Sequence, residues 1–327
     1  MMNDELAKEI EQQALAHGFS ACGIISLDDM DGYAKMYEER MENVPESRPF
    51  YSRPEMQQIT QVKKRFPWAK SLIICTTDYT RYRFPKELRN KFAKAFLLSR
   101  DGDTTTELYR KKHDFTRWLT DKGLRWEGGD DTSHLQIGGL RYAAMKAGLG
   151  IIRRNNFFYN ENGCYVELDG YAIDAECRLY HHADIRPCSD RCNLCQKACP
   201  SHALQGPNKF SPLRCVSFCN TFGLGWNPMK VTDEEMGTWT IGCDACQDAC
   251  PYNRRKNWDE GEPFSNLEEL VPYFDLERLQ TAPAEEIIEK VLPKTQEHIF
   301  PNQVNLLRES AKRAMKNSLG ETLDVRR

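Results

Sequence analysis

Apolar positions near the start of the chain recur at the spacing of an α-helix. Residues 4–17 carry them on one face, at Leu6, Ile10 and Ala14. A stripe of this kind is what a surface helix presents to a protein core. Gly18 is a natural end for the helix, because glycine readily adopts the left-handed backbone conformation that closes one. The pattern therefore predicts an amphipathic helix over residues 4–17.

Strand-like and helix-like patterns then alternate. Runs of apolar and β-branched residues, typical of strands, occur at 19–27, 71–77 and 163–173. Helical patterns cover 86–123, with a loop that begins at Ser99, and 136–147, where Gly148 follows as a C-terminal cap. This mixture predicts an α+β domain over residues 1–180.

The remainder of the chain changes character twice. Residues 181–257 are rich in cysteine and turn-forming residues, which indicates a small domain organised by metal. Residues 258–327 return to helical spacing, for instance at Val304, Leu307 and Ala311. We therefore expect three parts, of which the last is a short helical tail.

Composition fits a globular protein. The 327 residues are 40% hydrophobic and 10% aromatic, which is enough for two or three domains. The chain does not open with a basic region followed by an apolar stretch, and no run approaches the roughly 18 apolar residues that cross a bilayer. We therefore expect a cytoplasmic protein without membrane association. A formal net charge of −3 argues against a dedicated nucleic-acid binder, which usually has a basic excess.

Nine of the thirteen cysteines lie between Cys188 and Cys250. In a reducing compartment such clustering indicates metal binding rather than disulfides. The first block, 188–200, reads CSDRCNLCQKACP, and the second, 243–251, reads CDACQDACP. Each block ends in C-x2-C-x3-C-P, a tail typical of bacterial ferredoxins with two iron–sulfur clusters. The sequence therefore predicts two [4Fe–4S] clusters.

In such ferredoxins the cysteine before proline binds the other cluster. Cluster one would then be held by Cys188, Cys192, Cys195 and Cys250. Cluster two would be held by Cys199, Cys215, Cys243 and Cys246. Structural zinc is the alternative, since paired C-x2-C motifs also build four-cysteine zinc sites, but the proline tails and the two blocks favour clusters. Two points stay open: Cys219 could replace Cys215, and the spacing after Cys188 is one residue longer than ferredoxins usually have.

The order of these features resembles one known family. An α+β domain precedes AGLG (147–150), and the two-cluster module with GCDACQDACPYN (242–253) precedes a helical tail. The chain resembles the epoxyqueuosine reductases, cobalamin and iron–sulfur enzymes of queuosine tRNA modification that are related to reductive dehalogenases. The resemblance covers roughly residues 10–320 and is most specific at 141–170 and 188–253.

The resemblance implies a fold and a route for electrons. The first domain would be nitroreductase-like and hold cobalamin in its base-off form, and the cysteine module would be ferredoxin-like. Electrons from an external flavodoxin or ferredoxin would pass through both clusters to cobalt, and a side-chain acid would donate a proton. The enzyme would be an oxidoreductase that converts epoxyqueuosine to queuosine in tRNA, and we expect a monomer.

The resemblance also implies which residues bind the corrinoid. At the positions that match the family's motifs, they are Arg141, Lys146, Gly148, Gly150, Arg154 and Asn155. Arg154 and Asn155 stand where the family has a Lys-Asn pair. The AGLG glycines form a helix cap on any interpretation, and they could also let a flat macrocycle approach the backbone.

The proton donor is the main departure from the family. Family members carry an aspartate about thirteen residues before the alanine of AGLG, and this chain has His134 there. Imidazolium can donate protons near neutral pH, and a short insertion or deletion could instead bring Asp131 into the site. A Gly-Gly-Asp-Asp turn is also commonly a solvated loop, so the acid could be His134, Asp131 or neither.

Three further interpretations stay open. Residues 259–327 contain 14 Asp and Glu against 9 Lys and Arg, so the tail does not look like a strong tRNA clamp. The protein could therefore be a corrinoid or cluster reductase of another small molecule, or an electron-transfer activator without corrinoid. His181 and His182 precede the first cysteine block, and we interpret them as loop residues rather than metal ligands.

Overall fold

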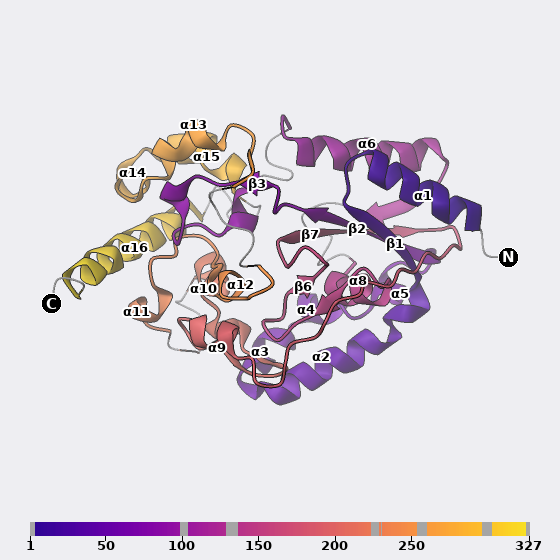
Figure 1. The fold of residues 1–327 in the computed structure, drawn as a ribbon, viewed down its shortest axis with the longest axis horizontal. Coiled ribbons are helices and arrows are strands. Elements are labelled where there is room, and N and C mark those ends of the chain that lie inside the picture. The colour runs from indigo at the N-terminus through magenta and orange to yellow at the C-terminus, as the bar shows by residue number, and fades with distance from the viewer. Residues whose placement is uncertain are drawn as a thin grey trace. The chain divides into compact units, whose positions relative to one another are not determined.

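The computed structural model forms two compact units (Figure 1). It describes residues 4–98, 104–128, 137–223, 229, 231–253, 260–295 and 303–324. Unit 1 comprises Met1–Tyr79, Tyr109–Cys192 and Pro207–Phe210, and unit 2 comprises Thr80–Leu108, Asn193–Gly206 and Ser211–Arg327.

Unit 1 is built on a four-stranded antiparallel sheet with the order β1-β2-β7-β4. The strands are β1 (Ala21–Ser26), β2 (Ser71–Asp78), β7 (Val166–Ile173) and β4 (Trp126–Gly128). Strand β2 lies inside the sheet and is buried on both faces, which explains why its sequence is a continuous apolar run. The strands expected near 19–27, 71–77 and 163–173 are confirmed.

Helices cover both faces of this sheet (Figure 1). The longer ones are α1 (Asp4–Ala16), α2 (Asp31–Asn43), α6 (Glu107–Asp121) and α8 (Leu140–Lys146). Because side chains alternate along β2, Ile73 packs with α1 and α6, while Leu72 packs with α2 and α8. The predicted first helix is confirmed, with Ile10 fully buried.

Unit 1 also contains several short helices and strands outside the four-stranded sheet. They are α3 (Arg48–Tyr51), α4 (Pro54–Gln58), α5 (Val62–Arg65), β5 (Ile151–Ile152), β6 (Phe158–Tyr159) and β9 (Lys209–Phe210).

Unit 2 consists mainly of short helices around the cysteines. Its helices are α9 (Leu194–Ala198), α10 (Val216–Phe222), α11 (Asp233–Met236), α12 (Ala245–Asp248), α13 (Leu267–Leu270), α14 (Leu276–Thr281), α15 (Ala284–Lys290) and α16 (Val304–Asp324). Its strands are β3 (Tyr82–Arg83), β8 (Leu204–Gly206) and β10 (Glu262–Pro263), and β3 pairs with β10 in parallel. The helical character expected for the tail is confirmed.

The helix expected over the first half of residues 86–123 is wrong. Only short 3₁₀ turns form there, at Lys86–Leu88 and Lys94–Leu97. The backbone N–H of Ala93 donates to the carbonyl of Ile241 at 2.9 Å, and Phe92 is fully buried. The N–H of Ala93 is thus used in a long-range hydrogen bond, whereas a helix would have needed it for a bond within the helix.

The compact units differ in their bounds from the three expected domains. Residues 80–108 group with the cysteine-rich segment and the tail, rather than with residues 1–79. Most of the cysteine-rich segment is in one compact unit with the tail, whereas residues 181–192 and 207–210 group with unit 1. Within the described residues, no helix has both the length and the apolar character to span a membrane.

Candidate active site

Three of the four predicted cluster-two ligands come together in unit 2. Burial raises the pKa of Cys215 to about 11, and the Cys199 thiol acts in the same direction. Burial also raises the pKa of Cys243, with further contributions from Cys215 and Cys199. Thiols affect one another in this way only when they are close. The fourth ligand, Cys246, lies on α12, one turn beyond Cys243.

Backbone N–H groups point at these sulfurs. The N–H of Ala203 lies 3.2 Å from the Sγ of Cys199. N–H groups of Ser217 and Phe218 approach Cys215, and both lower the pKa of this thiol against the effect of burial. The N–H of Ala245 approaches Cys243 in the same way. Sulfurs with amide donors beside them are the environment that a [4Fe–4S] cluster uses, so Cys199, Cys215 and Cys243 fit that group. No three Asp, Glu, His or Cys side chains in the described part of the chain are close enough to share a single metal ion.

Cys219 lies in a different environment. It is buried in an apolar cluster with Val216, Met236 and Trp239, and its Sγ lies 3.5 Å from the carbonyl oxygen of Leu213. These contacts are those of a small core residue. They favour Cys215 as the ligand.

A buried ion pair holds the second C-x2-C turn. The Nζ of Lys94 lies 2.8 Å from Asp248 and 3.5 Å from Asp244, the residue after Cys243. The backbone N–H of Lys94 also donates to Asp244 at 2.9 Å. Burial raises the pKa of Asp244 to about 6, while the positive charge of Lys94 opposes this shift. The turn that carries two cluster ligands is thereby fixed to the chain around Lys94.

The predicted ligands of cluster one are divided between the units. Cys188 and Cys192 belong to unit 1, and Cys195 and Cys250 belong to unit 2, so the assembly of this cluster stays a prediction. In unit 1, Nη1 of Arg153 lies 3.7 Å from the Sγ of Cys188. The guanidinium can donate a hydrogen bond to this sulfur. The resemblance pointed to Arg154 and Asn155 as cofactor-binding residues but not to their neighbour Arg153.

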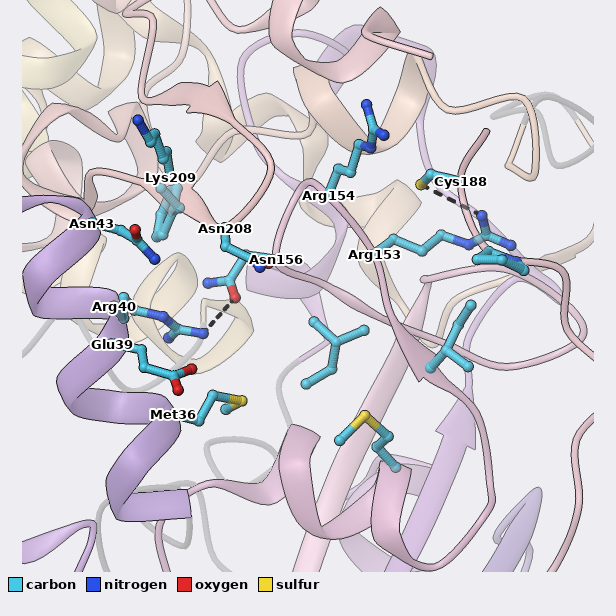
Figure 2. Close-up of a pocket in the computed structure, with 15 residues that line it drawn as sticks. Met36, Glu39, Arg40, Asn43, Arg153, Arg154, Asn156, Cys188, Asn208 and Lys209 are labelled. Atoms are coloured by element: carbon cyan, nitrogen blue, oxygen red, sulfur yellow. Dashed lines mark hydrogen bonds between the residues drawn. The ribbon is translucent and has the colours of Figure 1, made fainter. Parts of the chain in front are cut away.

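A cavity of about 370 Å³ lies within unit 1 and extends to Cys188 (Figure 2). It is lined by Met36, Glu39, Arg40, Asn43, Met145, Ile151, Ile152, Arg153, Arg154, Asn156, Pro187, Cys188, Asn208, Lys209 and Phe210. Four of these residues are basic and only Glu39 is acidic. The cavity therefore combines a positive lining, apolar walls and a predicted cluster ligand.

The structure brings some of the predicted corrinoid residues to this cavity. Arg154 lines it and donates to the carbonyl of Cys192 at 2.9 Å. Arg141 donates to the carbonyl of Asn156, which is a lining residue. Asn155 is buried, and its amide donates to the hydroxyl of Tyr159 at 2.8 Å.

Lys146 lies elsewhere. It is exposed, and its Nζ lies 5.6 Å from the centre of the Tyr142 ring. Lys146 is not among the residues that line the cavity, whereas its neighbour Met145 is. A corrinoid-binding role for Lys146 stays a prediction.

The glycines of AGLG face the protein's own backbone. A Cβ added to Gly148 would meet the carbonyl of His181, and one added to Gly150 would meet the carbonyl of Tyr159. Gly148 also has a φ of 74°, a conformation that favours glycine. Close chain packing thus accounts for both glycines, and the approach of a macrocycle to them stays a prediction.

Gly148→Ala is expected to destabilise the protein more than Gly123→Ala. Both glycines have positive φ, which costs about 1–2 kcal/mol with a side chain, but an added Cβ at Gly123 meets nothing within 4 Å. Only Gly148→Ala forces a backbone carbonyl to move. Urea unfolding of the full chain measures how much unfolding free energy each variant loses. Equal losses would show that the contact with His181 does not matter.

The two candidate proton donors, His134 and Asp131, lie outside the described residues. Strand β4 ends at Gly128 before them, and the described chain resumes at Ile137. The imidazole of His181 contacts residues near the start of the chain, in agreement with its interpretation as a loop residue. Its Nε2 lies 2.8 Å from the carbonyl oxygen of Cys22 and 3.4 Å from a Glu11 carboxylate oxygen.

Several known proteins are similar to this chain. Residues 188–253 match the family model described as the 4Fe-4S double cluster binding domain. An epoxyqueuosine reductase of Cellulophaga algicola is 24% identical over 299 residues, covering 87% of this chain and 89% of that protein. One of Synechococcus is 31% identical over 168 residues, covering 50% and 51%.

A solved structure has the same fold. It is an epoxyqueuosine reductase with an epoxyqueuosine-modified stem loop of tyrosine tRNA. The match covers 96% of this chain and 81% of the other, with a TM-score of 0.74 and 21% identity. The expected mixture of α and β structure with a two-cluster domain is confirmed.

Proposed function

The chain belongs to the epoxyqueuosine reductase family, and from this premise we propose that it reduces epoxyqueuosine in tRNA to queuosine with cobalamin held in the cavity of unit 1. One observation carries the proposal: the cavity touches both Cys188, a predicted ligand of cluster one, and Arg154 of the predicted corrinoid segment. Unit 1, with helices on both faces of its sheet, would be the nitroreductase-like corrinoid domain.

The reaction sets clear requirements. Removing the oxygen of an epoxide to leave a carbon–carbon double bond consumes two electrons and two protons and releases water. An external flavodoxin or ferredoxin would supply the electrons, and the eight cysteines would hold the two clusters that relay them. When bound, the corrinoid would supply a reduced, nucleophilic metal centre able to open the epoxide.

The chain's own residues would prepare the site. Cys188 borders the cavity, which would give electrons a short path from cluster one. Arg153 would hold the Cys188 sulfur in position through a hydrogen bond from its guanidinium. Met36, Met145 and Ile151 would form an apolar wall that excludes water from the reacting centre. His134 or Asp131 would hold the proton for the epoxide oxygen.

Anaerobic reconstitution with iron, sulfide and cobalamin tests this proposal. We expect corrinoid absorbance bands to remain after desalting, and the loaded protein to convert an epoxyqueuosine-containing tRNA stem loop. Bound corrinoid and full clusters without conversion would indicate a reductase of another small molecule. Full clusters without corrinoid uptake would instead indicate an electron-transfer activator.

A further inference from the structure

One guanidinium in unit 1 contacts both a predicted cluster ligand and the chain just before it. Nη1 of Arg153 lies 3.7 Å from the Sγ of Cys188, and Nη2 donates to the backbone carbonyl of Arg186 at 2.5 Å. Figure 2 shows the Arg153 side chain extending toward Cys188, with a dashed line for this contact. A guanidinium carries several N–H groups in a fixed plane, so one arginine can hold a sulfur and a backbone oxygen together.

A hairpin and an aromatic ring hold the rest of Arg153. The residue follows β5, which pairs with β6, and its backbone N–H donates to the carbonyl of Phe157 at 3.0 Å. Its guanidinium carbon lies 4.9 Å from the centre of the Tyr159 ring. Tyr159 is fully buried, and its hydroxyl accepts a hydrogen bond from the amide of Asn155 at 2.8 Å. Arg153 is itself only 6% exposed, so its charge is held in one place and largely out of water.

The neighbouring arginine contacts the same ligand segment differently. Cys188 and Cys192 lie on either side of a turn in which the N–H of Cys192 donates to the carbonyl of Ser189 at 3.1 Å. Arg154 donates to the backbone carbonyl of Cys192 at 2.9 Å. Arg153, in contrast, contacts a sulfur that would be bonded to iron. A half-buried sulfur with a hydrogen-bond donor beside it fits a ligand of a [4Fe–4S] cluster.

A charged donor at a ligand sulfur affects the reduction potential of a cluster. This potential depends on the net charge around the cluster and on hydrogen bonds to its sulfurs. Reduction adds one electron, so a positive donor stabilises the reduced form more than the oxidised form. The effect is larger where water is excluded and the dielectric constant is low. The buried Arg153 meets both conditions, whereas the donors at Cys199 and Cys215 are neutral backbone N–H groups.

We propose that Arg153 is a positioning residue that raises the reduction potential of cluster one. Electrons that arrive from cluster two are then drawn to the cluster beside the cavity. The step is a single electron transfer between clusters, in which one is oxidised as the other is reduced and no bond is made or broken. The inference rests on the proposed function, because it takes Cys188 to be a ligand of cluster one.

A redox titration of the full chain tests this role. The protein is reconstituted with iron and sulfide, without corrinoid, and both clusters are followed by EPR. We expect Arg153→Gln to change the reduction equilibrium of one cluster about 10-fold, which lowers its midpoint potential by about 59 mV for a one-electron couple. The other cluster should keep its potential. Two unchanged potentials in an Arg153→Gln protein with full iron content would overturn the proposal.

Arg191→Gln is the matched control. Arg191 lies between Cys188 and Cys192 in the sequence, and its side chain is exposed. Solvent and salt screen a charge in such a position, so this variant should change neither potential. A shift in Arg191→Gln as large as that in Arg153→Gln would show that any nearby positive charge suffices, and it would overturn the role of the contact with the Cys188 sulfur.

A second background assigns the shift to a cluster. Cys215→Ser is expected to retain cluster one alone, so a single potential is measured there. Adding Arg153→Gln to this background should lower that potential by the same amount. A potential that stays constant here, with a shift confined to cluster two in the full chain, would contradict the proposal.

Arg153→Lys guards against a folding defect, because it keeps a positive charge at the buried position. The compact ammonium of lysine does not reproduce the fork of a guanidinium, so the potential should still fall, by less than in Arg153→Gln. If Arg153→Gln fails to take up iron, an unchanged potential in a loaded Arg153→Lys overturns the proposal. A wild type that holds both clusters but takes up no corrinoid would overturn only the proposed function, because the potentials are measured without corrinoid.

Discussion

Cys215→Ser is expected to remove one [4Fe–4S] cluster, while Cys219→Ser keeps both. Cys215 lies with Cys199 and Cys243 in one group of interacting thiols. A serine hydroxyl is a poor substitute, because clusters are held by thiolates. Iron should fall from about eight to about four atoms per chain, since each cluster contains four. Electron relay should fail, and turnover with it.

Cys219→Ser is the internal control. Its sulfur lies in an apolar cluster beside the carbonyl of Leu213, so the variant should keep its iron and lose only some packing energy. Iron and sulfide analysis after anaerobic reconstitution measures both variants. The opposite result, with iron lost from Cys219→Ser and retained in Cys215→Ser, would reverse the ligand assignment.

Replacing the proton donor should cost turnover without removing a cofactor. A positioned acid contributes about 10²–10⁴-fold to rate, so His134→Ala or Asp131→Ala should show a loss of that size. The acid must be protonated to act, and turnover therefore falls as pH rises through its pKa. An unperturbed imidazole would place this fall near pH 6.5, and an aspartate near pH 3.9.

The pH profile distinguishes the two candidates. If His134 is the acid, the fall near pH 6.5 should disappear in His134→Ala and persist in Asp131→Ala. Asp130→Ala is a control that removes a carboxylate from the neighbouring position in the sequence, and it should retain turnover. Full turnover in both His134→Ala and Asp131→Ala would mean that neither residue donates the proton.

Local sequence patterns predicted the helices and strands whose buried side chains recur at a regular spacing. The stripe at Ile10 gave helix α1, and the apolar run at 71–77 gave the buried strand β2. Both patterns work because burial of each side chain follows from its period along the element. The cysteine spacing likewise predicted a ligand set, since the reach of a C-x2-C turn is local. The interactions among Cys199, Cys215 and Cys243 agree with the predicted pairing.

Contacts between distant residues decided the rest. Residues 92–94 pack against residues 241–248, so a segment with helical character joins unit 2. Spacing cannot reveal such a partner.

The sequence by itself predicted three strands of the sheet, its first helix and the cysteine motifs of a domain with two iron–sulfur clusters. The contact between Arg40 and Asn156, which lies 116 residues further along the chain, was decided only by the tertiary structure. The glycines of AGLG show the same distinction: their sequence predicted a cap, but only the fold placed the carbonyl of His181 against Gly148. Local periods fix elements, whereas the charge and shape of a cavity are set by residues that folding brings together.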